Sequence, residues 1–184
     1  MVGTGASAQL ILNQSQSPTN LVQTVLMGQG VFASNVTFNG NAGNMVAPTG
    51  MGPSEIGRFN GSNTSLGLNS GIFLCTGVAN SHLPGPNNEM AAVSGGIVIG
   101  GSAPSRPTPD LDLSQLTAWP GWRVSGGANI HSKAVQEFDF VPIKDMVSFR
   151  YVFSSEEYEM WVCSEYNDVF GFFINGPGIP TNIN

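Results

Sequence analysis

The sequence predicts an all-β protein, a β-sandwich of jelly-roll type with one short N-terminal helix packed on its edge. Three observations lead to this prediction. Only 10% of the 184 residues are charged, whereas a typical soluble domain has about 25%. The 24 glycines and 12 prolines supply many tight turns. Several short segments are rich in β-branched and aromatic residues and alternate between apolar and polar side chains, which is typical of half-buried strands.

The helix is predicted over residues 18–27. Ser17 can cap its N-terminus, and Pro18 stands at the first helical position, where its missing N–H costs nothing. Gly28 then ends the helix. The residues that recur on one face are all apolar and form a stripe for burial against the sheets: Leu21, Val22, Val25 and Leu26.

Two strands are predicted in the first half of the chain. Residues 31–38 alternate, which places Phe32, Val36 and Phe38 on one face. Asn39-Gly40 follows, and this dipeptide is typical of a two-residue hairpin turn. Residues 71–76 read as a buried strand, because the run Ile-Phe-Leu is apolar without alternation.

Three strands are predicted in the second half, over residues 135–141, 147–153 and 169–174. The middle one alternates between large apolar residues and a polar face that carries Arg150, so it predicts a half-buried antiparallel strand. The turn over residues 142–145 predicts that the first two strands pair as a hairpin.

The length predicts a single domain over residues 10–184, preceded by residues 1–9. Those first nine residues are interpreted as a flexible tail or as the end of a signal peptide, because Ala6-Ser7-Ala8 resembles a signal-peptidase site. No apolar run reaches the roughly 20 residues of a membrane span. A net charge of −6 with six scattered basic residues argues against nucleic-acid binding.

Several motifs carry a family resemblance. They are residues 149–158 (FRYVFSSEEY), 163–173 (CSEYNDVFGFF), 66–77 (LGLNSGIFLCTG) and 137–142 (EFDFVP). On these motifs the chain resembles the choice-of-anchor L domain of secreted and surface proteins of bacteria, notably Bacteroidota. The resemblance implies an exported location more than it implies an activity. Family members continue with further strands after Pro177, which implies that the domain extends beyond Asn184.

One acidic segment concentrates five carboxylates within thirteen residues and contains no Lys or Arg. Calcium binding is one interpretation, because Ca²⁺ takes six to eight oxygen ligands from carboxylates, amides and carbonyls. In the other interpretation Glu156 or Glu157 pairs with Arg150, and the Asn-Asp dipeptide forms a turn before the next strand. The candidate calcium ligands are Glu156, Glu157, Asn167 and Asp168, with Asp110 and Asp112 from a distant loop.

The tryptophans and cysteines leave further alternatives open. Trp119, Trp122 and Trp161 either stack against a sugar or cover the open end of the core. Cys75 and Cys163 either form one disulfide in an oxidising compartment or stay as two buried thiols.

The sequence thus favours a noncatalytic extracellular or cell-surface module for adhesion or extracellular structure, stabilised by Ca²⁺. Its expected partners are a surface glycan or another extracellular protein, including a second copy of itself. A carbohydrate-binding module and a fibre subunit that assembles by strand addition are the alternatives. A glycoside hydrolase is disfavoured, because Glu156 and Glu157 would point to opposite faces of an extended strand.

Overall fold

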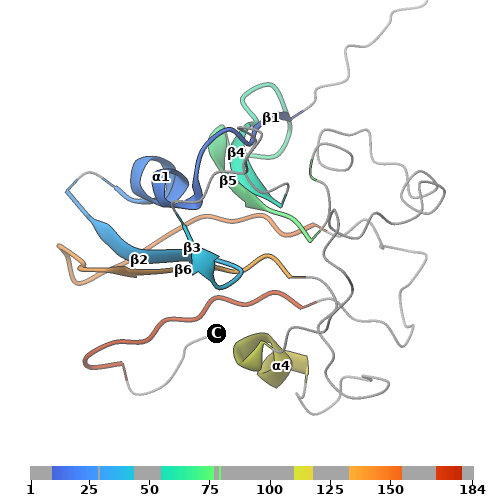
Figure 1. The fold of residues 1–184 in the computed structure, drawn as a ribbon. Helices are drawn as coiled ribbons and strands as arrows, with labels where there is room; N and C mark the ends of the chain where they lie inside the picture. Colours follow the sequence, from blue (N-terminus) through green and yellow to red (C-terminus); the bar gives the residue numbers. More distant parts are fainter. Residues whose placement is uncertain are drawn as a thin grey trace, which may run out of the picture. The chain divides into compact units, whose positions relative to one another are not determined.

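The computed structural model describes residues 10–28, 30–43, 55–76, 79, 110–117, 133–154 and 169–179. The chain divides into two compact units, Met1–Ala103 with Lys133–Glu156 and Pro104–Ser132 with Glu157–Asn184. Among the described residues of the first unit, six strands form two antiparallel sheets of three strands each (Figure 1). These sheets confirm the predicted all-β class. The described strands form no closed barrel and do not establish a jelly-roll order.

The first sheet has the order β1 (Ile11–Asn13), β4 (Ile56–Asn60), β5 (Ser70–Leu74). It contains the strand that was predicted over residues 71–76. Phe59 and Phe73 form a buried cluster with Ala79, while Ile56 belongs to a second buried cluster. Because neighbouring side chains on a strand point to opposite faces, the two clusters lie on opposite faces of this sheet. The sheet is therefore covered on both sides.

A glycine allows close packing in the middle of this sheet. A Cβ atom at Gly57 would lie 2.6 Å from the carbonyl oxygen of Asn13 and 2.8 Å from the ring of Phe73. Real Cβ atoms essentially never come so near to other heavy atoms. The neighbouring strand and the phenyl ring thus occupy the space that any other residue at this position would need.

The second sheet has the order β3 (Asn41–Ala42), β2 (Ala33–Phe38), β6 (Gln136–Phe140). Asn39 and Gly40 connect β2 to β3 with φ angles of 49° and 76°, and Phe38 pairs with Asn41 across them. Positive φ at both central residues defines the type I′ hairpin, which Asn-Gly favours. The predicted two-residue turn is confirmed.

A β-bulge in β2 corrects the predicted face of Phe32. Ser34 pairs with Asp139 and Thr37 with Glu137, so β2 uses one more residue than β6 over this stretch. The extra residue is accommodated at Asn35, which has a φ of 50°. It turns Phe32 away from the core: Phe32 is 77% exposed, while Val36 and Phe38 are 7% and 6% exposed. The prediction that all three share one face was wrong, because simple alternation holds only without a bulge.

The predicted N-terminal helix is present as a short α-helix, α1 (Pro18–Leu21), continued by a π-helical segment, η1 (Val22–Leu26). The Ser17 hydroxyl accepts a hydrogen bond from the Asn20 amide at 3.3 Å, and Pro18 is the first helical residue. Both features were predicted. Leu21 and Val22 are completely buried, which confirms the centre of the apolar stripe.

The position of the helix differs from the prediction. Leu21 forms one buried cluster with Phe38 of β2 and Ile56 of β4, so the helix packs against both sheets rather than on an edge. Figure 1 shows α1 between β2 and the β4–β5 pair. A backbone hydrogen bond from Thr19 to the Gly43 carbonyl, 2.8 Å long, attaches the helix to the end of β3. The helix therefore links the two sheets.

The second half of the chain follows the prediction less closely. Strand β6 confirms the prediction over residues 135–141, but it pairs with β2 about 100 residues earlier in the sequence. Residues 146–154 and 169–175 are assigned to no strand, and all of residues 146–154 are exposed, so the predicted hairpin and the half-buried strand are not confirmed. A helix that the sequence did not predict, α4 (Leu111–Thr117), lies in the second unit.

Candidate functional site

The outer face of β2 and β6 carries the best-defined cluster of polar side chains. The Thr37 hydroxyl donates to Glu137 Oε2 at 3.1 Å, and Asn35 Nδ2 donates to Asp139 Oδ2 at 2.6 Å. Glu137 and Asp139 alternate with inward-facing phenylalanines along β6, so both carboxylates point to the same side. The bulge at Asn35 brings its amide opposite the second carboxylate.

This polar face presents hydrogen-bonding groups at a solvated surface. Glu137 and Asp139 are exposed, and two positions along a strand separate them by about 7 Å. Each carboxylate accepts one hydrogen bond from β2 and keeps other acceptor positions for solvent or a ligand. Hydroxyl, amide and carboxylate groups on one exposed face can hydrogen-bond to polar groups of a ligand.

The sequence analysis did not select these residues. The signal was present in the alternation of Gln136-Glu-Phe-Asp-Phe140, which predicts two carboxylates on one face of a strand. The partners Asn35 and Thr37 were not recognisable, because the pairing of β2 with β6 joins distant parts of the chain.

Asp110, a predicted calcium ligand, caps helix α4. Its Oδ1 atom accepts a hydrogen bond from the Leu113 amide at 3.1 Å, and its carbonyl oxygen accepts one from Ser114 at 2.9 Å. Asp112, the other predicted ligand from this region, lies in the first turn of the helix. Both positions suit the partial positive charge at a helix N-terminus. Capping therefore accounts for Asp110 and for one oxygen of its carboxylate.

The other predicted calcium ligands, Glu156, Glu157, Asn167 and Asp168, lie outside the described residues. Within the described ranges, no three His, Cys, Asp or Glu side chains come together as a metal site would require. Calcium binding therefore stays a prediction.

Arg150, the predicted partner of Glu156 or Glu157, contacts a different part of the chain. Its Nη2 atom donates to the carbonyl oxygen of Gly67 at 3.0 Å, across 83 residues of sequence. Gly67 has a φ of 77° and lies in the loop between β4 and β5. The guanidinium group thus attaches residues 146–154 to this loop, and it keeps further donors for other acceptors.

The remaining predicted site residues are only partly described. Trp119, Trp122, Trp161 and Cys163 lie outside the described residues. Cys75 is half-buried and packs against the cluster of Phe59, Phe73 and Ala79. Sugar stacking by the tryptophans and a disulfide between the cysteines therefore stay predictions.

A comparison with known protein families shows to which family this chain belongs. A model of the choice-of-anchor L domain matches residues 10–184, which covers both compact units apart from residues 1–9. The chain belongs to this family. No curated protein and no solved structure matched this choice-of-anchor L chain.

Family membership supports part of the predicted function. The choice-of-anchor L family is one of surface-associated or secreted modules and is not known for enzymatic activity. In the described part of this member, no helix combines the length and the hydropathy that crossing a membrane would need.

Proposed function

We propose that this choice-of-anchor L domain is a noncatalytic adhesion module that binds polar groups at the outside of a bacterial cell through the outer face of β2 and β6. The supporting observation is the family match over residues 10–184, because the family consists of surface or secreted modules. The polar face adds the contact surface: Asn35, Thr37, Glu137 and Asp139 offer amide, hydroxyl and carboxylate groups on one plane of a sheet.

The low charge of the chain agrees with this role. Lys, Arg, Asp and Glu make up only 10% of the residues of the chain, so the surface outside Glu137 and Asp139 offers mainly neutral hydrogen-bonding groups. Hydrogen bonds between neutral groups are less sensitive to salt than ion pairs between exposed charges.

The test of adhesion uses the purified chain and a glycan array together with intact bacterial cells. We expect saturable binding that falls at least tenfold in the double variant Asn35→Ala, Asp139→Ala. A matched control is Arg58→Ala with Asn60→Ala, which removes two exposed polar side chains from the other sheet. Equal binding by both double variants would show that the contact does not lie on β2 and β6. Turnover of a glycan would contradict the noncatalytic role.

The proposal retains calcium as a stabilising ion of the acidic segment. We expect a chelator to lower the melting temperature of the wild-type chain, and Glu157→Gln to abolish this difference. Asp110→Asn separates ligation from capping, because asparagine caps helices as well as aspartate does but lacks the charge that Ca²⁺ prefers. A melting temperature that does not change with chelator would remove calcium from the proposal.

A further inference from the structure

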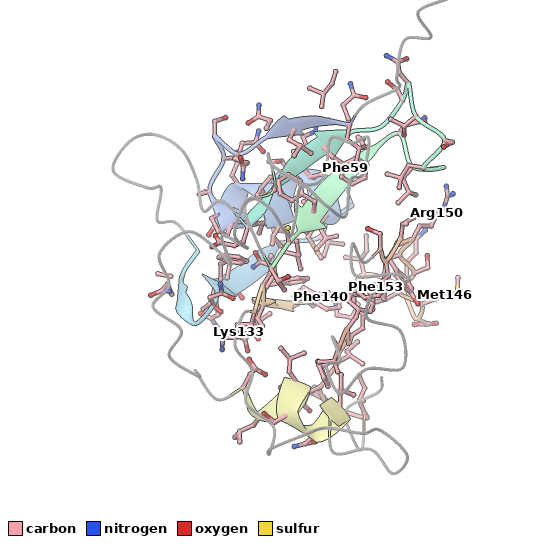
Figure 2. All side chains as sticks on the ribbon, turned by 90° about the vertical axis from the view of Figure 1, so that its right-hand side faces the viewer. Phe59, Lys133, Phe140, Met146, Arg150 and Phe153 are labelled. Carbon is pink, nitrogen blue, oxygen red and sulfur yellow. The ribbon has the colours of Figure 1, made fainter. Side chains whose placement is uncertain are left out.

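Five large apolar side chains are more than half exposed at one end of the β3–β2–β6 sheet. They belong to two short segments, one leading into β2 and one following β6. Their exposed fractions are 77% for Phe32, 76% for Val141, 62% for Ile143, 79% for Met146 and 52% for Val147. We call this set the end patch. Figure 2 labels Met146 on the run that follows β6.

The two segments of the end patch lie side by side. Ala33 pairs with Phe140 in the ladder between β2 and β6, and Phe32 and Val141 are the next residues outward from this pair. A Cβ atom added to Gly30 would lie 3.7 Å from Cδ1 of Ile143. The segment before β2 therefore lies next to the turn after β6.

The side chain of Gln23 holds the backbone on either side of Phe32. The Gln23 Nε2 atom donates to the Val31 carbonyl at 2.9 Å, and the Ala33 amide donates to Gln23 Oε1 at 2.9 Å. One amide group thus fixes the backbone on both sides of Phe32. A segment whose backbone is fixed in advance loses less entropy when a partner covers it, so this position is suited to anchor a contact.

The charges of the end patch indicate the partner. The turn contains one lysine, Lys144, followed directly by one aspartate, Asp145, and both are exposed. Anionic membranes attract clusters of basic residues, and here the single lysine is balanced by its neighbour. In a twofold contact, residue i meets residue j and j meets i. Lys144 of each copy would then face Asp145 of the other, which forms two ion pairs around an apolar centre.

We propose that the end patch is a twofold contact between two copies of this chain. Exposed apolar side chains gathered in one place mark interaction sites, and aromatic residues enriched at interface centres are consistent with Phe32 as the anchor. This inference concerns self-association and stands independently of the adhesive role of the polar face.

The first test measures the oligomeric state by sedimentation velocity over a wide range of protein concentration. We expect a reversible dimer whose dissociation constant rises at least tenfold in the double variant Phe32→Ser, Met146→Ser. The control Ile11→Ser removes a side chain that is 63% exposed on the other sheet and should leave the dimer unchanged. The proposal is overturned if the wild-type chain stays monomeric at every concentration, or if the dissociation constant is unchanged in the Phe32→Ser, Met146→Ser variant.

The second test exchanges the two charges. Lys144→Asp alone and Asp145→Lys alone each bring like charges together across a twofold axis, so both should weaken the dimer. The combined variant restores opposite charges and should recover the wild-type dissociation constant. Failure of the combined variant to recover would exclude the twofold arrangement.

A third measurement separates a protein partner from a lipid surface. The wild-type chain is sedimented with vesicles of phosphatidylcholine, and we expect it to stay in the supernatant. Binding to the vesicles that is lost in the Phe32→Ser, Met146→Ser variant would assign the patch to a membrane and overturn the proposal. Unchanged circular dichroism and melting of all variants shows that the fold is intact, as expected for side chains that are mostly exposed.

Discussion

The two sheets of this domain differ in how many of their faces are covered. The β1–β4–β5 sheet has buried clusters on both faces, one around Phe59 and one around Ile56. The β3–β2–β6 sheet buries only the face that carries Phe38, and its other face presents Glu137 and Asp139 to solvent. The sequence reflects this difference: residues 72–74 of β5 are continuously apolar, whereas residues 136–140 of β6 alternate. A continuous apolar run indicates cover on both faces, and alternation indicates one.

This difference gives the two sheets different roles: the β1–β4–β5 sheet stabilises the fold, and the β3–β2–β6 sheet has a free face for binding partners. The two-sided sheet contains Gly57, where a strand and a ring leave no room for a side chain. The one-sided sheet contains the bulge at Asn35, which redirects Phe32 and the Asn35 amide toward the surface. Bulges commonly reorient side chains next to functional surfaces. We therefore expect stability to depend mainly on the first sheet and contacts with partners mainly on the second.

The largest expected effect tests the buried face of the first sheet. Phe59→Ala removes a ring that packs against Phe73 and Ala79, and it should lower the free energy of unfolding by about 3–5 kcal/mol. The control Phe32→Ala removes the same ring from the exposed end of the second sheet and should change the free energy by less than about 0.5 kcal/mol. Urea denaturation of the two variants measures both values. Equal losses would show that the two sheets do not differ as described.

The next effect tests the helix that joins the sheets. Leu21→Ala leaves a cavity between Phe38 and Ile56 and should destabilise the domain by about 2–5 kcal/mol. Leu26→Ala, at the exposed end of the same helical segment, should cost much less because this side chain is already 39% exposed. Thermal melting should stay a single transition in both variants. Equal losses of stability in the two variants would contradict the packing of Leu21 against both sheets.

A smaller effect tests how the second sheet presents Phe32. Gln23→Ala removes both hydrogen bonds to the backbone of residues 31 and 33, and the loss of these partly buried bonds should cost about 1–3 kcal/mol. Amide hydrogen exchange of Ala33 should become faster at the same time. Thr24→Ala serves as the control, because its hydroxyl bonds only within the helix, to the Asn20 carbonyl. Unchanged exchange at Ala33 would contradict the role of Gln23.

The smallest effect tests the open face of the second sheet. The pair of Thr37 and Glu137 is exposed and should contribute about 0.2–1 kcal/mol. A double-mutant cycle with Thr37→Val and Glu137→Gln isolates this coupling energy from the effects of the single changes. A coupling above that range would show that the face is less hydrated than its exposure indicates.

Several elements of the fold were predictable from local sequence because their causes are local. The helix start at Ser17 and Pro18, the turn at Asn39-Gly40 and the strand at residues 70–74 depend on the capping, φ preference and hydropathy of neighbouring residues. The strand was predicted to be buried, but only Phe73 is buried and Leu74 is 41% exposed. Helix α4 was not predicted, although Asp110 has the side chain of a good N-cap. Its carboxylate was interpreted as a calcium ligand instead, because capping and ligation use the same oxygen atoms.

The sequence by itself determined the all-β class, the start of the N-terminal helix, the hairpin turn and, through family motifs, the choice-of-anchor L family. Only the tertiary structure decided that β6 pairs with β2, that a bulge at Asn35 exposes Phe32, and that the helix lies between the sheets. The physical reason is the range of the interactions. Turn and cap preferences act over a few neighbouring residues, whereas a ladder between strands about 100 residues apart depends on backbone groups that no local pattern reveals.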